Sequence, residues 1–326
     1  MKGRYKFEVR SKKVIFRFEI KRNITIIKGD SASGKTTLLN MMYEYLLNGR
    51  ESGFIVSTNA KYYVYLRDVP GRSWKEMFEP LKKTIIFVEE NNNFIFSQEF
   101  AEYALASGNY FVFVSRAPLK MLPYSIHEIY EIKTRKKQAD MRQVLCDFEE
   151  LYSNFPNINN NKMSLVVTED SNSGFTFYSA LFEKSEVISA GGNSNIINVM
   201  KEQTTKDMFV IADGAAFGSM VEDCLEFAEQ NMDKRISMWM PESFEFILLR
   251  AGIVQNNMLN AILDNPCEYV ECEKYPSWER FFTEMLIRFS DEKYKYSKTH
   301  LNHYYILPHN LEKVRKYLSE TLQMTL

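Results

Sequence analysis

The chain has 326 residues, of which 45% are hydrophobic and 25% are charged. This composition is typical of folded globular proteins and excludes a disordered or collagen-like chain. The net charge is −1, but residues 1–150 carry 25 Lys and Arg against 18 Asp and Glu, while residues 151–326 carry 16 against 24. The asymmetry predicts two modules and argues against a broad basic, nucleic-acid-binding face on the second.

The sequence shows no membrane-spanning or secretory segment, because no apolar run approaches the length of a membrane span. The cysteines form no Cys-x-x-Cys pair and are sparse, which favours reduced thiols. They are Cys146, Cys224, Cys267 and Cys272. We therefore expect a cytoplasmic protein without a membrane partner.

The first module begins with extended segments at residues 5–10 and 14–20, followed by a buried strand at 23–28 and a helix at 37–47. The alternation of strand and helix continues beyond them and predicts a parallel α/β sheet. The further strands are expected at 54–56, 62–66, 84–88, 110–114 and 126–132, and a further helix at 96–106.

A glycine-rich loop lies between the buried strand and the first helix. Residues 29–37 read Gly-Asp-Ser-Ala-Ser-Gly-Lys-Thr-Thr, a full match to G-x-x-x-x-G-K-[ST]. Glycine lets backbone N–H groups wrap around phosphates, and the following helix directs its positive end at them. Lys35 is expected to contact the β- and γ-phosphates of ATP, and Thr36 to ligate Mg²⁺. The predicted nucleotide-binding residues are Gly29, Asp30, Ser31, Ala32, Ser33, Gly34, Lys35, Thr36 and Thr37.

A second motif of the first module is the apolar strand at 84–88, which ends in Glu89 and Glu90. It is similar to a Walker B strand, in which the first acid supports Mg²⁺ and the second activates the attacking water. The pattern predicts Glu89 for the metal and Glu90 as the general base, with Lys35 as the other catalytic residue. Solvated acids at a strand end are the alternative.

Together these motifs resemble the P-loop superfamily, and most closely the ATP-binding-cassette type of ATPase found in recombination and phage-defence proteins. The resemblance implies a P-loop NTPase domain over residues 1–140. It departs from the family because no Leu-Ser-Gly-Gly signature follows. Ser115 and Arg116 stand where the family usually carries a switch histidine. Either could sense the γ-phosphate or stabilise charge in the transition state, and a plain surface arginine is equally open.

The second module restarts the α/β alternation after charged and Asn-rich stretches at 133–140 and 153–162, where we place the linker. The pattern predicts a second α/β domain over residues 160–326 that ends in a mainly helical tail at 278–326. Its strands are expected at 164–167, 187–188 and 208–211, and its helices at 175–184, 195–202 and 219–231.

Acids follow two of these strands: Glu169-Asp170 after the first, and Asp213 after the third, with Gly191-Gly192 between. This arrangement resembles the topoisomerase–primase (Toprim) fold of overcoming-lysogenisation-defect nucleases. The resemblance implies Mg²⁺ binding by Glu169 and Asp213. The family's second Asp is replaced by Ala215, for which Glu222 or Asp223 could substitute. Ordinary strand-end acids remain the alternative.

Two further segments of the second module have weaker patterns. Residues 241–245, Pro-Glu-Ser-Phe-Glu, resemble a helix-start element of Toprim-containing defence proteins, although helix capping explains the acids equally well. Lys293, Lys295 and Lys298 alternate with tyrosines, as in a patch that contacts a nucleic acid backbone or as on a solvated face.

The expected function is ATP binding and hydrolysis, with the nucleotide state controlling the Toprim-like domain, in defence against phage or mobile DNA. The alternative is a nucleotide-gated binding or sensor protein with an inactive C-terminal module. A small-molecule kinase is a third interpretation, but it leaves the second module unexplained. The expected partners are nucleotide, a second copy or another protein, and nucleic acid.

Overall fold

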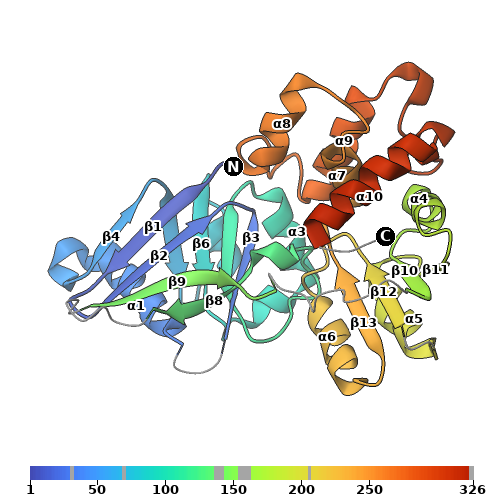
Figure 1. Ribbon diagram of the computed structural model, residues 1–326. Helices are drawn as coiled ribbons and strands as arrows, with labels where there is room; N and C mark the ends of the chain where they lie inside the picture. Colours follow the sequence, from blue (N-terminus) through green and yellow to red (C-terminus); the bar gives the residue numbers. More distant parts are fainter. Residues whose placement is uncertain (30–32, 68–70, 136–142, 153–162, 205–206, 323–326) are drawn as a thin grey trace. The chain divides into compact units, whose positions relative to one another are not determined.

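The computed structural model describes residues 1–29, 33–67, 71–135, 143–152, 163–204 and 207–322. The chain forms two units, each a mixture of helix and sheet as expected (Figure 1). Unit 1 comprises Met1–Leu151 and Asn265–Pro276, and unit 2 comprises Tyr152–Asp264 and Ser277–Leu326.

Unit 1 contains a nine-stranded sheet in the order β4-β1-β2-β9-β8-β3-β7-β6-β5. Its strands are β1 (Tyr5–Arg10), β2 (Val14–Ile20), β3 (Ile24–Lys28), β4 (Ile55–Thr58), β5 (Lys61–Tyr65), β6 (Thr84–Val88), β7 (Tyr110–Val114), β8 (Ile129–Thr134) and β9 (Val144–Glu150). Its helices are α1 (Lys35–Asn48), α2 (Trp74–Phe78) and α3 (Gln98–Ala106), with short 3₁₀ turns η1 (Gly49–Ser52), η2 (Asn93–Phe96), η3 (Ile126–Glu128) and η5 (Pro266–Glu268).

The sheet of unit 1 is mixed, whereas the sequence predicted a parallel sheet. Strands β3, β5, β6, β7 and β8 pair in parallel, as expected. However, β1 pairs antiparallel with β2 and β4, and β8 pairs antiparallel with β9. Only residues 11–13 join β1 to β2, and a connection that short cannot make the crossover that a parallel pair needs. The predicted domain end at 140 is also too early, because β9 completes this sheet.

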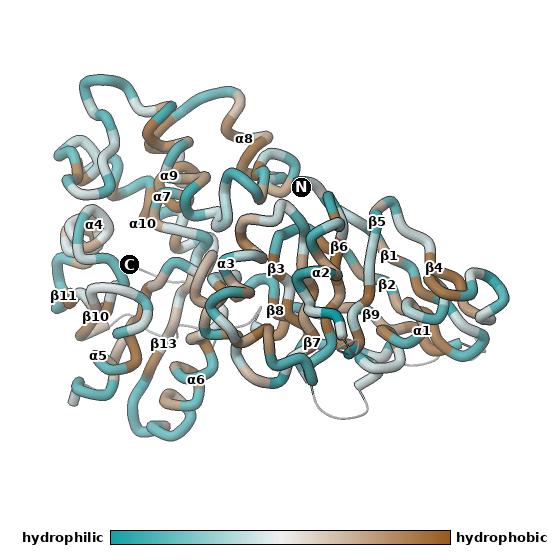
Figure 2. The backbone as a smooth tube through the Cα atoms, turned by 180° about the vertical axis from the view of Figure 1, so that it is seen from behind, coloured by the Kyte–Doolittle hydropathy of each residue, from teal (hydrophilic) through white to brown (hydrophobic). Residues whose placement is uncertain are grey.

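The central strands of unit 1 are buried on both faces, which explains their continuous apolar sequences. In β7, Tyr110, Val112 and Val114 belong to the core shared with α1. The alternate side chains Phe111 and Phe113 lie with their rings 5.6 and 5.8 Å from that of Phe100 on α3. Brown, hydrophobic stretches of the tube in Figure 2 include parts of these strands.

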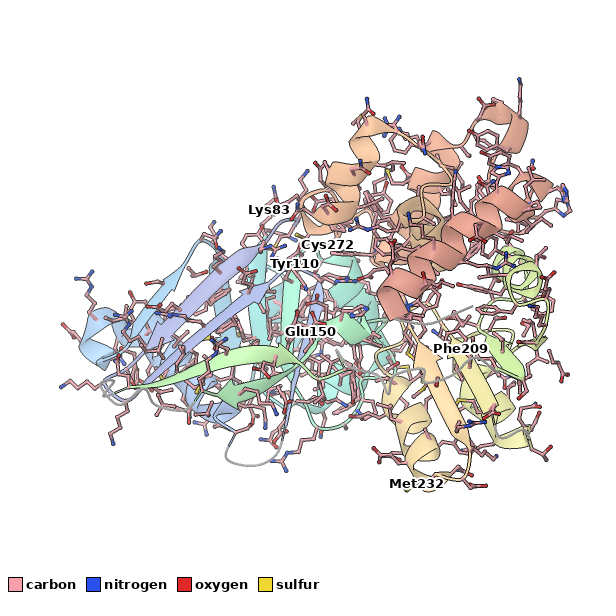
Figure 3. All side chains as sticks on the ribbon, viewed as in Figure 1. Lys83, Tyr110, Glu150, Phe209, Met232 and Cys272 are labelled. Atoms are coloured by element: carbon pink, nitrogen blue, oxygen red, sulfur yellow. The ribbon has the colours of Figure 1, made fainter. Side chains whose placement is uncertain are left out.

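Residues 265–276 belong to unit 1, although the sequence assigned them to a second domain over 160–326. The Gly3 N–H donates to the Cys267 carbonyl at 2.6 Å, and the Cys272 N–H donates to the Met1 carbonyl at 2.9 Å. Cys272 and Tyr110 are both buried here (Figure 3). Backbone pairing between segments so distant in sequence leaves no local signal, so the prediction missed it.

Unit 2 contains a four-stranded, fully parallel sheet in the order β11-β10-β12-β13. The strands are β10 (Leu165–Thr168), β11 (Glu186–Ser189), β12 (Asp207–Ile211) and β13 (Arg235–Trp239). The helices are α4 (Ser173–Leu181), α5 (Ile196–Glu202), α6 (Val221–Gln230), α7 (Phe244–Arg250), α8 (Asn257–Asp264), α9 (Trp278–Phe289) and α10 (Pro308–Leu322), with 3₁₀ turns η4 (Asn193–Asn195), η6 (Glu292–Tyr294) and η7 (His303–Ile306). Described residues after 277 are therefore mainly helical, as predicted.

Candidate functional sites

The glycine-rich loop joins β3 to α1, in the strand–loop–helix order that the sequence predicted. Gly29 and Gly34 have φ values of +124° and +93°, which residues with a Cβ rarely adopt. Among the described residues, no side chain caps the N-terminus of the 14-residue helix α1. Three of the predicted binding residues, Asp30, Ser31 and Ala32, lie outside the described residues.

The Lys35 side chain lies along this loop. Its ammonium nitrogen donates to the Gly29 carbonyl and, at 2.8 Å, to the Ser33 hydroxyl. Lys35 is only 6% exposed, whereas Thr36 and Thr37 are exposed on the first turn of α1. The lysine and the N-terminal end of α1 thus bring positive charge to one place, which suits an anion.

Glu89 and Glu90 follow β6, and one strand, β7, separates β6 from the loop strand β3. These strands are parallel, so their carboxyl ends meet at one sheet edge, where α/β folds commonly bind ligands. The Glu89 carboxylate accepts hydrogen bonds from the backbone and side-chain nitrogens of Asn91, each at 3.0 Å. Glu89 is therefore held locally, while the side chain of Glu90 is 27% exposed.

Ser115 and Arg116, which follow β7, lie between the loop and the acids. Ser115 is 1% exposed and donates its hydroxyl to the Ala117 carbonyl at 2.7 Å, which is a turn contact. The Arg116 Nε lies 3.5 Å from the Glu90 Oε2, and the arginine side chain is 58% exposed. Of the two residues that the sequence left open, Arg116 is the one that contacts the predicted general base.

In unit 2, Glu169 and Asp213 follow the neighbouring parallel strands β10 and β12. The Asp213 N–H donates to the Glu169 Oε2 at 2.8 Å, and the Asp213 Oδ1 accepts from the Phe244 N–H at 2.9 Å. The two acids that the sequence singled out are therefore adjacent. They line a pocket of about 150 Å³, which we call the acidic pocket. Its lining residues are Glu169, Asp170, Ser171, Gly191, Gly192, Asp213, Phe244, Glu245, Glu279 and Lys298.

Three charged residues of the acidic pocket were not predicted as site residues. Glu245 in α7 is 1% exposed, and its Oε1 accepts from the Tyr296 hydroxyl at 2.8 Å. Its Oε2 is buried with no hydrogen-bond partner among the described residues. Lys298 contacts the Glu279 carboxylate with its ammonium group. The Pro-Glu-Ser-Phe-Glu stretch was the available signal for Glu245, but local capping explained its acids equally well.

The three lysines that alternate with tyrosines, Lys293, Lys295 and Lys298, are all exposed, as on a solvated face. Lys295 pairs with Glu292 at 3.0 Å, and Lys298 also lines the acidic pocket. Tyr296, by contrast, is 3% exposed and is buried in unit 2. Contact of these lysines with a nucleic acid backbone stays a prediction.

Burial changes the ionisation of these acids. It raises the pKa of Glu169 to about 7, and it raises the pKa values of Asp213 and Glu245 above their ordinary range. Repulsion by Glu169 adds to the effect on Asp213. Lys298 keeps its positive charge, because the Glu279 carboxylate and the other acids outweigh its burial and raise its pKa. The acidic pocket is therefore a place where negative charge is costly unless a cation balances it.

Other acids near these strand ends have their own contacts. The Asp170 carboxylate accepts from the N–H groups of Asn172 and Gly174 at 3.0 and 2.6 Å, which is a turn and helix-start contact. Glu222 accepts from the Tyr152 hydroxyl at 3.0 Å, and neither Glu222 nor Asp223 lines the acidic pocket. The first turn of α6 therefore does not replace the acid missing at Ala215.

Comparison with known proteins does not assign the chain to a family. No protein-family model matches the chain, and no curated protein matches it significantly. In the part of the chain that the structure describes, no helix is both long and apolar enough to cross a membrane. Within the same residues, no three or more His, Cys, Asp or Glu side chains form a ready-made metal-binding group.

Proposed function

We propose that this chain binds and hydrolyses ATP at the loop of residues 29–37, in a P-loop NTPase unit. The observation that carries the proposal is the position of Lys35, whose ammonium group folds over Gly29 and Ser33 at an uncapped helix start. A lysine at this position can bind phosphate, because the charged oxygens of a triphosphate are stronger hydrogen-bond acceptors than the Gly29 carbonyl and the Ser33 hydroxyl.

The chemistry follows from the acids on the same sheet edge. Glu90 accepts a proton from water as the water oxygen bonds to the γ-phosphorus. The bond from that phosphorus to the β–γ bridging oxygen breaks, and its electron pair leaves with ADP. Lys35 and Arg116 oppose the negative charge that accumulates on the phosphate oxygens.

Mg²⁺ fits the donor set at this edge, since the Thr36 hydroxyl and the Glu89 carboxylate are oxygen ligands. When bound, it supplies positive charge beside the phosphates. The Asn91 contacts fix the Glu89 carboxylate in one orientation, and this favours Glu89 as a positioning group for the metal's water shell.

The proposed role of unit 2 is that of a Toprim-like output domain, with Mg²⁺ at Glu169 and Asp213 and a phosphodiester as substrate. Nucleotide state would control it, and the setting would be cytoplasmic defence against phage or mobile DNA. The adjacency of the two acids supports this role. By analogy with cassette-type ATPases, a second copy or a partner protein would complete the nucleotide site. Because the chain lacks the Leu-Ser-Gly-Gly signature, a second copy would not do so with that motif.

A second candidate function is a nucleotide-gated binding protein with an inactive unit 2. Ala215 in place of an acid favours it. The test for both is phosphate release from ATP with Mg²⁺, followed by cleavage of single- and double-stranded DNA and RNA. Turnover that disappears in Lys35→Ala supports the ATPase; cleavage that disappears in Glu169→Ala supports the nuclease. Turnover without any cleavage favours the gated binding protein.

A further inference from the structure

The acidic pocket of unit 2 contains a third carboxylate that the Toprim resemblance does not supply. Ala215 leaves the β12 end with a single acid, yet Glu245 reaches the same pocket from α7. Ser243 starts that helix by accepting from the Phe246 N–H at 3.2 Å. The Asp213 carboxylate binds the Phe244 N–H, which fixes the first turn of α7, and with it Glu245, against the end of β12.

Each of the three carboxylates has one oxygen held by a donor of the protein. Glu169 accepts from the Asp213 N–H, Asp213 accepts from the Phe244 N–H, and Glu245 accepts from the Tyr296 hydroxyl, at 2.8, 2.9 and 2.8 Å. The second oxygen of each accepts no hydrogen bond from the described residues. All three carboxylates line the acidic pocket, and these hydrogen bonds fix their orientation, although among the described residues they do not form a ready-made metal-binding group.

The buried oxygen of Glu245 is the observation that points to a ligand. A buried carboxylate oxygen without a partner is costly, and native proteins rarely tolerate one without a functional reason. A cation suits the pocket, because five carboxyl groups and one ammonium group line it. Lys298 offsets part of this charge, since its ammonium group acts on Glu245 electrostatically, but its ion pair is with Glu279 and it makes no hydrogen bond to the buried Glu245 oxygen.

We infer that Glu245 is the third acidic ligand group of a divalent-cation site formed with Glu169 and Asp213, and that it replaces the acid missing at Ala215. The inference rests on the proposed metal-binding role of Glu169 and Asp213. The cation binds with part of its water shell, because no three acidic side chains in the described residues are arranged to coordinate an ion directly. Mg²⁺ and Mn²⁺ suit such a site, since small hard cations keep several waters and take few carboxylates.

The pocket volume agrees with a hydrated ion. The volume of about 150 Å³ leaves room for an ion together with water molecules. Lys298 then acts as a competing charge at the rim, which moderates the affinity for the cation.

The test measures Mn²⁺ binding by electron paramagnetic resonance in the full chain. Thr36→Ala is present throughout and nucleotide is omitted, so that the loop of unit 1 does not contribute. Glu245→Gln is expected to weaken binding at least tenfold, while keeping the acceptor for Tyr296. Glu222→Gln is the matched control, because it makes the same chemical change outside the pocket, and it should keep the parent affinity.

Asp213→Asn separates this inference from the proposed function. Loss of binding in both Asp213→Asn and Glu245→Gln supports the three-acid site. Loss in Asp213→Asn with parent affinity in Glu245→Gln overturns the inference and leaves the proposed pair intact. If the parent protein does not bind Mn²⁺ even at about 1 mM, a concentration that fills weak sites, the result overturns the three-acid site and also the proposed metal binding by Glu169 and Asp213.

Lys298→Met provides a second variant, at a position whose side chain is 50% exposed. Removing the competing charge should tighten Mn²⁺ binding several-fold. Mn²⁺ should also raise the melting temperature of the parent and not that of Glu245→Gln. Unchanged or weaker binding in Lys298→Met contradicts the competition, and an equal thermal shift in both proteins contradicts the role of Glu245.

Discussion

Arg116 and Glu90 form an ion pair across the ends of two adjacent strands, with 3.5 Å between the Arg116 Nε and the Glu90 Oε2. The pair connects the proposed general base to the residue that a γ-phosphate would attract. An approaching triphosphate competes with Glu90 for the guanidinium group, so its arrival frees the carboxylate to bind the attacking water. The arrangement predicts that Arg116 holds the Glu90 carboxylate when no nucleotide is bound.

The first prediction concerns Arg116. Arg116→Ala should lower ATP turnover on the order of 10²-fold, as loss of a transition-state charge donor does elsewhere, while ADP affinity changes little. Arg116→Lys should recover part of the rate, because a lysine keeps the charge without the planar fork. Steady-state phosphate release and ADP titration measure the two effects. Full turnover in Arg116→Ala would make Arg116 a surface residue that merely pairs with Glu90.

The second prediction concerns Gly214, which follows Asp213. A Cβ at this position would lie 2.5 Å from the Met240 carbonyl and 2.8 Å from the Pro241 carbonyl. Gly214→Ala should therefore destabilise unit 2 by about 2 kcal/mol or more, because backbone atoms cannot move aside cheaply. Gly252→Ala is the control: it has a φ of +71° but open space around it, and should cost about 1 kcal/mol. Thermal or urea unfolding compares them, and equal losses would contradict the close approach.

The third prediction concerns the pH dependence of stability. The pKa of Glu169 is raised by burial to about 7 from an ordinary 4.5, so the folded state binds this proton more tightly than the unfolded state. Its contribution to stability is therefore complete below pH 4.5 and is lost as the pH rises through 7. In metal-free protein, the melting temperature should fall between pH 5 and pH 8. This fall should be larger in the wild type than in Glu169→Gln. The same change in melting temperature with pH in both proteins would contradict this prediction.

Much of unit 1 was predictable because its strands are short, apolar and buried on both faces. Strands β3, β6 and β7 each consist of five residues, all buried, and the loop between β3 and α1 has a strict sequence pattern. Strand β9 was missed because Cys146 is its one fully buried side chain, with acids at three of its seven positions. Its place in the sheet depends on pairing with β2 and β8, which lie far away in sequence.

The acidic pocket was predictable only in part, for a similar reason. Strand ends in a parallel sheet share one edge, so the adjacency of Glu169 and Asp213 followed from the pattern. Glu245, Glu279 and Lys298 come from segments whose positions depend on tertiary packing, and nothing local distinguishes them from capping or solvated residues. Asp170 also lines the pocket, and its carboxylate accepts hydrogen bonds at the start of α4.

The central claim is that the loop of residues 29–37 supports ATP hydrolysis with Glu90 as the base. The most direct measurement is phosphate release from ATP with Mg²⁺ by the wild type, Lys35→Ala and Glu90→Gln, together with ATP binding by each. We expect turnover in the wild type, loss of binding and turnover in Lys35→Ala, and retained binding with turnover reduced at least 10²-fold in Glu90→Gln. Wild-type turnover in Lys35→Ala, or undiminished turnover in Glu90→Gln, would contradict the account.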